Sequence, residues 1–468
     1  MKALIQRNLF LHSLAVRAVI ILVVGLGFFA VSATSLAQVS SSTSYAITLD
    51  QRLGGITRTP TDPIIVAMSN LVAAGNLLGA AQYAIANEPG FYNVVVRGQA
   101  AQMPTRTGNL LSNSPTTDYV AGWLGVIYNN MDARNLVNGN FLFTVNPTLA
   151  PGVPSNLVND VLTSNNMYAF LDSNYINSSG ANNSVNIASL LQNSGAQQYL
   201  NSVGAAQGSA GVAVNNPDPA GLITSRGFAE GNLLAGTNRA MVRNSILEFL
   251  CEDISSYADV GPDAPIGRDV DRYPAGSDTT YQTQCVMCHN RLDGMKPAFS
   301  LIDMDTNGNY IQHALYNPQP CTTPASRTDY TQAGHNTCQG QFDANNIAIK
   351  ENRNSQVFPA GFQVTTPAWN NYATSGIYSS MFGWQGATAG SGTAQFGQML
   401  GNSTAFSTCM AQTVFTTVCK RAPASDETAQ VQALGANFAG AWQYNLQTLY
   451  AQVAILPNCT GSPTSPAQ

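Results

Sequence analysis

The stretch PIIVAMSNLVAAGNLLGAAQYAI, residues 63–85, has the clearest periodicity in the chain. Its apolar residues recur three and four positions apart over about six turns, which is the spacing of one face of an α-helix. Pro63 stands at the first helical position, where its missing N–H removes no hydrogen bond. We therefore predict that one long helix follows Asp62.

Other segments have the same helical periodicity. The segment NRAMVRNSILEFLC, which ends at Cys251, places apolar residues on one face, and similar segments follow Ser403 and begin near Leu446. The predicted core positions of these helices are Val242, Ile246, Phe249, Leu250, Phe406, Cys409, Met410, Phe415, Val418, Leu446, Leu449, Tyr450 and Val453. Strand-like alternation is sparse, and FYNVVVRG, residues 91–98, is the best strand candidate. We predict a mainly α-helical fold of several parts with long irregular loops.

The N-terminus has the features of a secretory signal peptide. Three basic residues precede an apolar run over residues 18–31, and the small residues Ser35 and Ala37 follow it. We predict a signal peptide over residues 1–37 that is cleaved after Ala37, so that the mature chain is exported. The alternative is an uncleaved membrane anchor, but the apolar run is short for a bilayer span. We therefore expect no stable membrane span after cleavage.

The charge of the mature chain argues against one class of partner. Three of the 20 basic residues and none of the 25 acidic residues lie in the leader, so the mature chain has a net charge of −8. Nucleic acid binding relies on Lys and Arg contacts to phosphates, and the sequence has no basic stripe. We therefore expect no nucleic acid partner. The apolar fraction of 44% is enough to fill a core.

Composition also suggests how the chain is divided. The segment over residues 203–221 consists of small residues with Asn, Pro and Asp, which is typical of a linker or loop. We predict an N-terminal helical domain over residues 38–202 and a second domain over residues 222–460. The tail, residues 461–468, is predicted to be disordered because it lacks apolar residues.

The most specific motif is TQCVMCHN, residues 283–290. Its C-x-x-C-H spacing places two thiols and an imidazole on one turn of helix. Cys285 and Cys288 could then reach the two vinyl groups of a porphyrin, while His289 ligates the iron. We predict a covalent haem c bound by these three residues, which makes the domain over residues 222–460 haem-bearing and cytochrome c-like.

Other uses of the cysteine pair stay open. A thioredoxin-like redox pair requires a βαβ setting, which the neighbouring sequence lacks. A zinc site requires two more ligands, for which the mature chain offers His313, His335 and further cysteines. A simple disulfide between Cys285 and Cys288 is the remaining alternative.

The segment CVMCHNRLDGMKPAFSLIDMD, residues 285–305, resembles the pattern C-x-x-C-H-x-x-M-D-P-x-G-F-x-x-x-x-F-D of large exported proteins from planctomycetes and other bacteria. Those proteins combine several families of unknown function with a planctomycete-type cytochrome c domain. Further similarity lies in residues 142–150, 221–251 and 396–427, so the resemblance covers about residues 120–459.

The resemblance implies an exported bacterial protein, in the periplasm or on the outer surface, with Cys285, Cys288 and His289 as the haem-binding residues. It implies no activity, because the family has no settled one. In two departures after the motif, the family's Met-Asp-Pro and Gly-Phe are here Leu292-Asp293-Gly294 and Ala298-Phe299.

The ligand on the side of the iron opposite His289 decides the chemistry. A second strong ligand favours electron transfer, whereas an open position favours reaction with small molecules. We favour His313 as this ligand, with a hydrogen-bonded surface histidine as the alternative. Met381 and Met399 lie at sequence distances typical of distal methionines, although both could be core residues. Met295 is expected to stay on the side of His289.

Six further cysteines are expected to form three disulfides, because their number is even and the predicted compartment is oxidising. They are Cys251, Cys321, Cys338, Cys409, Cys419 and Cys459. Cys321 and Cys338 lie in one polar, turn-rich insertion and are predicted to pair locally. The sequence does not give the full connectivity.

One segment partly matches a calcium loop. DMDTNGNYIQHA, residues 303–314, has Asp303, Asp305 and Asn307 at the first ligand positions, but Ala314 replaces the Glu of the twelfth. We therefore predict a tight surface turn. The chain has no G-x-S-x-G or H-E-x-x-H motif, which argues against a hydrolase.

The sequence thus favours a monohaem c-type cytochrome-like protein that transfers electrons with a redox partner protein or a small-molecule substrate. The alternative is a disulfide-stapled envelope or surface binding protein, in which haem or the cysteine pairs are mainly structural. A haem enzyme with an open iron site is a third candidate. The chain is much longer than one haem requires, so we expect the excess to dock a partner or substrate.

Overall fold

The computed structural model is mainly helical, which confirms the predicted fold class. It describes residues 40–102, 116–176, 185–201, 212–233, 238–259, 283, 285–304, 310–312, 351–354, 358–363 and 366–463. Within these ranges, no helix is both long and apolar enough to cross a membrane. The predicted signal peptide lies outside the described residues, as do His313, His335, Cys321 and Cys338.

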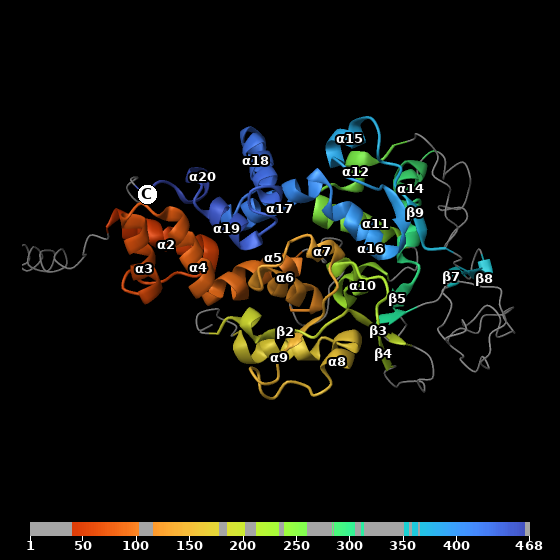
Figure 1. The fold of residues 1–468 in the computed structure, drawn as a ribbon, viewed down its shortest axis with the longest axis horizontal. Helices are drawn as coiled ribbons and strands as arrows, with labels where there is room; N and C mark the ends of the chain where they lie inside the picture. The colour runs from red at the N-terminus through yellow and green to blue at the C-terminus, as the bar shows by residue number, and fades with distance from the viewer. Residues whose placement is uncertain are drawn as a thin grey trace, which may run out of the picture.

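Three helices form the N-terminal end of the molecule (Figure 1): α2 (Ser41–Gly54), α3 (Pro63–Ala73) and α4 (Leu77–Asn87). The prediction of one long helix after Asp62 is wrong, because the chain turns between α3 and α4. Gly75 adopts a φ of +76°, which is open to glycine but strained for other residues. The side chain of Asn76 then accepts a hydrogen bond from the backbone N–H of Gly79 and caps α4.

The strand predicted over residues 91–98 is also wrong, because Phe91–Val96 form the π-helical turn η1 and Arg97–Gln102 continue as α5. The buried residues Phe91, Tyr92, Val95 and Val96 recur four positions apart, so the turn presents one apolar face to the core. Packing on that face outweighs the strand preference of the three consecutive valines. The amide of Asn93 bonds the backbone of Val185 and Ile187, which fixes the turn to η2 (Ile187–Leu190).

Helix α6 (Asp118–Tyr128) runs through the centre of the molecule, and all its residues from Asp118 to Ile127 are buried. A helix that is apolar on every side requires neighbours on every side. Its neighbours include α5, α7 (Asn135–Asn138), α10 (Arg226–Asn232), η3 (Gly221–Thr224) and the antiparallel pair of β1 (Phe143–Val145) and β2 (Leu191–Asn193). Helices α8 (Leu157–Thr163) and α9 (Asn166–Tyr175) pack on β1.

The strands are short. A four-stranded sheet has the order β4-β3-β6-β5, with β3 (Gln198–Asn201) and β6 (Tyr310–Gln312) parallel. Strand β4 (Val212–Asn215) lies inside the segment predicted as a linker or loop, and it pairs antiparallel with β3. The other paired strands are β7 (Glu351–Asn354) with β8 (Phe358–Gln363), and β9 (Ala368–Asn370) with β10 (Ala389–Ser391). The domain boundaries stay a prediction.

The helices predicted after Asn238, Ser403 and near Leu446 are confirmed. They are α11 (Arg239–Leu250), α17 (Thr404–Cys419) and α19 (Leu446–Ala454), and all their predicted core positions are buried. The other C-terminal helices are α16 (Gly392–Gly401), α18 (Thr428–Ala439) with the short turn η7 (Ser425–Glu427), and α20 (Pro457–Thr460). Helix α19 packs on α4 and α20 packs on α2, so the first and the last helices of the described chain lie side by side (Figure 1).

Two disulfides join these helices, as expected for part of the cysteine set. Cys251, at the end of α11, is bonded to Cys409 in α17, with a Cα–Cα distance of 5.3 Å. Cys419, at the end of α17, is bonded to Cys459 in α20 at 4.7 Å. Helix α17 is therefore covalently held by two partners.

Candidate functional site

Helix α14 (Val286–Leu292) carries the C-x-x-C-H motif at the end of the molecule opposite to α2–α4 (Figure 1). It packs on α11 and on the short helix α12 (Ile254–Tyr257). Cys285 stands at the N-cap position, and both Cys288 and His289 lie within the helix. The structure thus brings the three predicted haem-binding residues onto one helical turn.

Both cysteines of the motif are free thiols and are partly exposed. The other four cysteines in the described part of the chain are paired in disulfides. Burial raises the pKa of the Cys288 thiol, so without a bound metal it is protonated at neutral pH. The described residues contain no group of three or more His, Cys, Asp or Glu side chains that could hold a metal ion.

The imidazole of His289 is held by a buried carboxylate. Its Nδ1 lies 3.0 Å from Oδ2 of Asp293, one helical turn further along the chain. The side chain of Asp293 is only 1% exposed. Arg239, at the start of α11, contacts the same carboxylate through Nε and through Nη2 at 3.2 Å, and Nζ of Lys296 lies 3.7 Å away.

These contacts determine the charge of Asp293. Burial by itself raises the pKa of this carboxyl, but the hydrogen bond with His289 and the positive charges of Lys296 and Arg239 outweigh burial. The pKa therefore lies below its ordinary value, and the carboxylate is ionised at neutral pH. Because an ionised carboxylate only accepts hydrogen bonds, Nδ1 of His289 must donate, which fixes the tautomer of the ring.

A second set of contacts fixes the helix itself. The guanidinium of Arg291 is buried, donates to the carbonyl of Tyr372 at 2.6 Å and pairs with Asp259 at 3.0 Å. It also lies 4.6 Å from the ring centroid of Tyr378 in α15 (Ile377–Phe382). Tyr378 in turn donates to Asp259 at 3.0 Å. Helix α14 can therefore rotate little about its axis, which keeps the motif in place.

The segment after α14 comes close to β9. A Cβ at Gly294 would lie 2.4 Å from the carbonyl oxygen of Asn370 in β9. The backbone N–H of Asn370 donates to the carbonyl of Gly294 at 2.8 Å. The close approach of β9 therefore requires glycine. The following turn η6 (Lys296–Phe299) buries Ala298 and Phe299.

The candidate distal ligands lie in different surroundings. Met399 is buried in α16, and its Sδ lies 3.6 Å from the side-chain amide of Asn371. Met295 is buried after α14, whereas Met381 is partly buried in α15. His313 lies outside the described residues, so the second iron ligand stays a prediction.

The segment predicted as a tight surface turn lies between β5 (Ile302–Met304) and β6. Asp303 is opposite Ile311 in this antiparallel pair. Residues 305–309, which include the other candidate calcium ligands, lie outside the described part of the chain.

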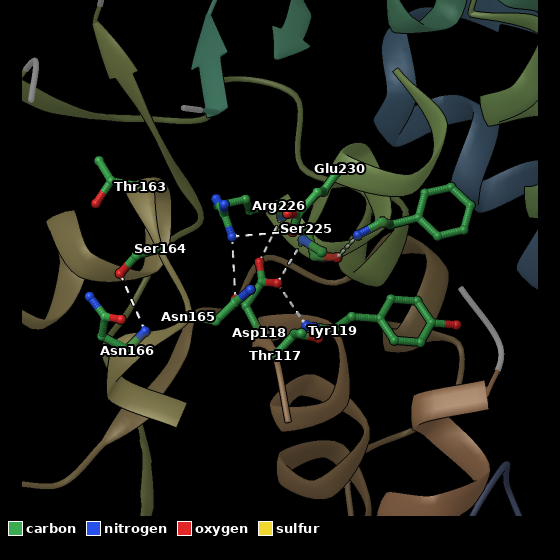
Figure 2. Close-up of polar contacts among 12 residues, drawn as sticks. Thr117, Asp118, Tyr119, Thr163, Ser164, Asn165, Asn166, Ser225, Arg226 and Glu230 are labelled. Atoms are coloured by element: carbon green, nitrogen blue, oxygen red, sulfur yellow. Dashed lines mark hydrogen bonds and ion pairs between the residues drawn. The ribbon is translucent and has the colours of Figure 1, made fainter. Parts of the chain in front are cut away.

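Figure 2 shows a second buried carboxylate, which sequence reasoning did not find. Asp118 accepts hydrogen bonds from three backbone N–H groups: Arg226 at 2.7 Å, Gly227 at 2.8 Å and Tyr119 at 2.8 Å. The side chain of Arg226 extends beside it to Asn165, at 3.3 Å. Asp118 therefore joins the N-terminal ends of α6 and α10. Only its position at the start of an apolar helix could have indicated this role.

Known proteins do not identify the arrangement around α14. No family model, no curated protein and no solved structure matches the chain. The role of the site therefore has to be inferred from its own residues.

Proposed function

We propose that this protein is an exported, monohaem c-type cytochrome-like protein that transfers electrons with a redox partner protein or a small-molecule substrate. Cys285 and Cys288 hold the porphyrin covalently, and His289 ligates the iron. When bound, the haem supplies one-electron chemistry. The disulfides fit an oxidising compartment, in agreement with a location in the periplasm or on the outer surface of a bacterium.

One observation carries the proposal: two free thiols and a carboxylate-bonded imidazole occupy a single turn of α14. Each thiol can add its S–H bond across one vinyl group, which forms a C–S and a C–H bond and leaves no other product. The imidazole can then ligate iron through Nε2, because Nδ1 is bonded to Asp293. Metal-bound histidines commonly donate their other ring N–H to a carboxylate in this way.

The donor set of the site also argues against the other uses of the cysteine pair. A structural disulfide would join Cys285 to Cys288, but both are free whereas the described disulfides are formed. A zinc site would require further ligands, and the described residues offer no cluster of them beside α14.

The rest of the chain acts as a scaffold in this proposal. Arg291 and its contacts to Asp259 and Tyr378 keep α14 in one orientation, so the imidazole approaches the iron along a defined direction. Met287, between the two cysteines, is 40% exposed. An exposed apolar side chain within the motif would suit a transient partner surface.

The test is expression in a bacterial strain that matures other c-type cytochromes. We expect a denaturing gel stained for haem peroxidase activity to show a coloured band at the size of the protein. The double variant Cys285→Ala/Cys288→Ala should lose the colour. Met287→Ala changes a residue between the two cysteines and should keep the colour, so it serves as the matched control.

A colourless wild-type band in that strain would contradict the proposal. It would favour a binding protein in which the cysteine pairs are structural, the second candidate. A coloured band with a high-spin spectrum would instead favour a haem enzyme with an open iron site, the third candidate.

A further inference from the structure

Asp293 follows the last residue of α14 and contacts side chains from α11, α14 and the turn η6. Its carboxylate accepts hydrogen bonds from His289 and Arg239 and forms an ion pair with Lys296, and only His289 belongs to the C-x-x-C-H motif. Arg239 comes from a different helix, and Lys296 from the turn after α14. All four side chains are at most 14% exposed, so water screens their charges little.

A hydrogen bond from Nδ1 to an ionised carboxylate has a chemical effect on the ring. It draws the Nδ1 proton towards the carboxylate, which leaves more electron density on the imidazole. The ring then becomes a stronger donor at Nε2, and second-sphere partners of this kind tune metal sites. A stronger donor stabilises ferric iron more than ferrous iron.

Two cations share the same carboxylate. Arg239 donates to Oδ1 through Nε and to Oδ2 through Nη2, and Lys296 lies 3.7 Å from Oδ1, while His289 is bonded to Oδ2. Their charges hold part of the electron density of the carboxylate, so less of it acts on the imidazole. Asp293 therefore makes the imidazole of His289 a stronger donor, and Arg239 and Lys296 oppose this effect.

We propose, on the basis of the haem function above, that Asp293 is a positioning residue that lowers the reduction potential of the haem through His289, and that Arg239 limits this effect. Asp293 keeps the Nδ1 proton in place and makes the imidazole a stronger ligand. Arg239 offsets part of the negative charge of Asp293.

The experiment compares Asp293→Asn and Arg239→Gln with a matched pair of variants on the same face of the protein. The control pair is Asp253→Asn and Arg243→Gln. Arg243 lies one turn after Arg239 in α11, and its Nη2 pairs with Asp253 at 2.8 Å. Both groups act electrostatically on Cys288, so they lie near the motif, but no described contact joins either to Asp293. Loss of a charge near the haem changes the reduction potential in both pairs of variants, whereas the effect through His289 is limited to Asp293→Asn and Arg239→Gln.

Two readouts are measured on each haem-loaded protein: the midpoint potential by spectroelectrochemistry, and the ferric electron paramagnetic resonance g values, which depend on the donor strength of the axial imidazole. We expect Asp293→Asn to increase the equilibrium constant for reduction at least tenfold, which is about 59 mV for one electron. Arg239→Gln should lower the potential. Both should shift the g values, and the control pair should not.

Potential shifts no larger than those of the control pair, or unchanged g values, would overturn this inference while leaving the proposed function intact. A wild type without haem would overturn both. If Asp293→Asn leaves Arg239 and Lys296 uncompensated and does not fold, the sign of the Arg239→Gln shift decides. A rise in potential in that variant contradicts the inference.

Discussion

Asp118 and Asp293 are both buried aspartates at helix ends, but different groups surround their carboxylates. Asp118 accepts three backbone N–H groups, two of them from the first residues of α10. Asp293 contacts three side chains, His289, Arg239 and Lys296. Burial raises the pKa of Asp118 in spite of its hydrogen bonds, whereas the contacts of Asp293 lower its pKa in spite of burial.

The difference distinguishes a carboxylate that joins two helices from one that contacts a proposed iron ligand. Asp118 is held by backbone N–H groups that the fold fixes, with the charge of Arg226 beside it, and its hydrogen bonds join α6 to α10. Two side-chain partners of Asp293, Arg239 and Lys296, carry full charges, and the third is the imidazole of the C-x-x-C-H motif. A change at Asp293 can therefore reach an iron ligand, whereas a change at Asp118 reaches only the packing of two helices.

The largest expected effect is on stability at Asp118. In Asp118→Asn, an NH₂ group replaces one carboxylate oxygen and faces a backbone N–H, so at least one buried donor loses its partner. The backbone N–H and the amide N–H that faces it are then both unpaired. Each such group costs about 1–3 kcal/mol, so we expect a loss of about 2–6 kcal/mol in the free energy of unfolding. Urea denaturation of the haem-loaded protein measures it.

Asp132→Asn is the control for that variant, because Asp132 is about one-third exposed and pairs only with the neighbouring Arg134. It should change the free energy of unfolding by less than about 1 kcal/mol. The midpoint potential should stay unchanged in both variants. A shifted potential in Asp118→Asn would break the distinction between the two aspartates.

A third buried carboxylate, Asp50, sharpens the comparison through pH. No hydrogen-bond donor in the described residues reaches its oxygens, and Arg58 is 3.9 Å away. Burial and the neighbouring Glu88 raise the pKa of Asp50 to about 7. The folded protein therefore binds this proton more tightly than the unfolded chain does, so the contribution of Asp50 to stability is greatest in acid and falls as the pH rises from about 4 to 7.

The slope of that fall is at most about 1.4 kcal/mol per pH unit. Asp50→Asn should remove it, which makes the variant more stable than the wild type at pH 7 but not at pH 4. Asp293 has the opposite sign, because its lowered pKa makes stability fall as the pH drops below about 4. Denaturation curves at several pH values measure both. An unchanged slope in Asp50→Asn would show that Asp50 is not the titrating group.

A smaller effect is expected where α14 meets β9. Gly294→Ala places a Cβ against the backbone oxygen of Asn370, and overpacking of this kind costs about 1–3 kcal/mol. Gly98→Ala is the matched control, because a Cβ in α5 meets no atom within 4 Å. The control should gain up to about 1 kcal/mol through helix propensity. Equal stability of the two variants in thermal unfolding would show that the approach of β9 is not tight.

The sequence predicted the parts of this fold that depend on local periodicity. Helices such as α17 and α19 repeat apolar residues over several turns, so their buried faces could be read from spacing alone. The turn between α3 and α4 was missed because apolar periodicity continues through Gly75 and Asn76. The valines of η1 were mistaken for a strand because their local preference is outweighed by packing with distant helices.

The motif residues of the site could be identified from spacing, but their surroundings could not. His289 and Asp293 lie on the same helix, and their spacing of four residues brings them together. Arg239 lies 54 residues before Asp293, and no periodic pattern links the two. The partners of Asp118 are similarly distant, at a separation of 108 residues for Arg226. Such contacts depend on how the helices pack, which the sequence pattern does not encode.

The most direct test of the central claim is the intact mass of the protein purified from a strain that matures c-type cytochromes. We predict the mass of the chain plus one haem, with the added mass retained in denaturant and lost in Cys285→Ala/Cys288→Ala. Fragment masses should place the addition on the peptide that contains His289. A bare chain, two hydrogens lighter through a Cys285–Cys288 disulfide, would contradict the account.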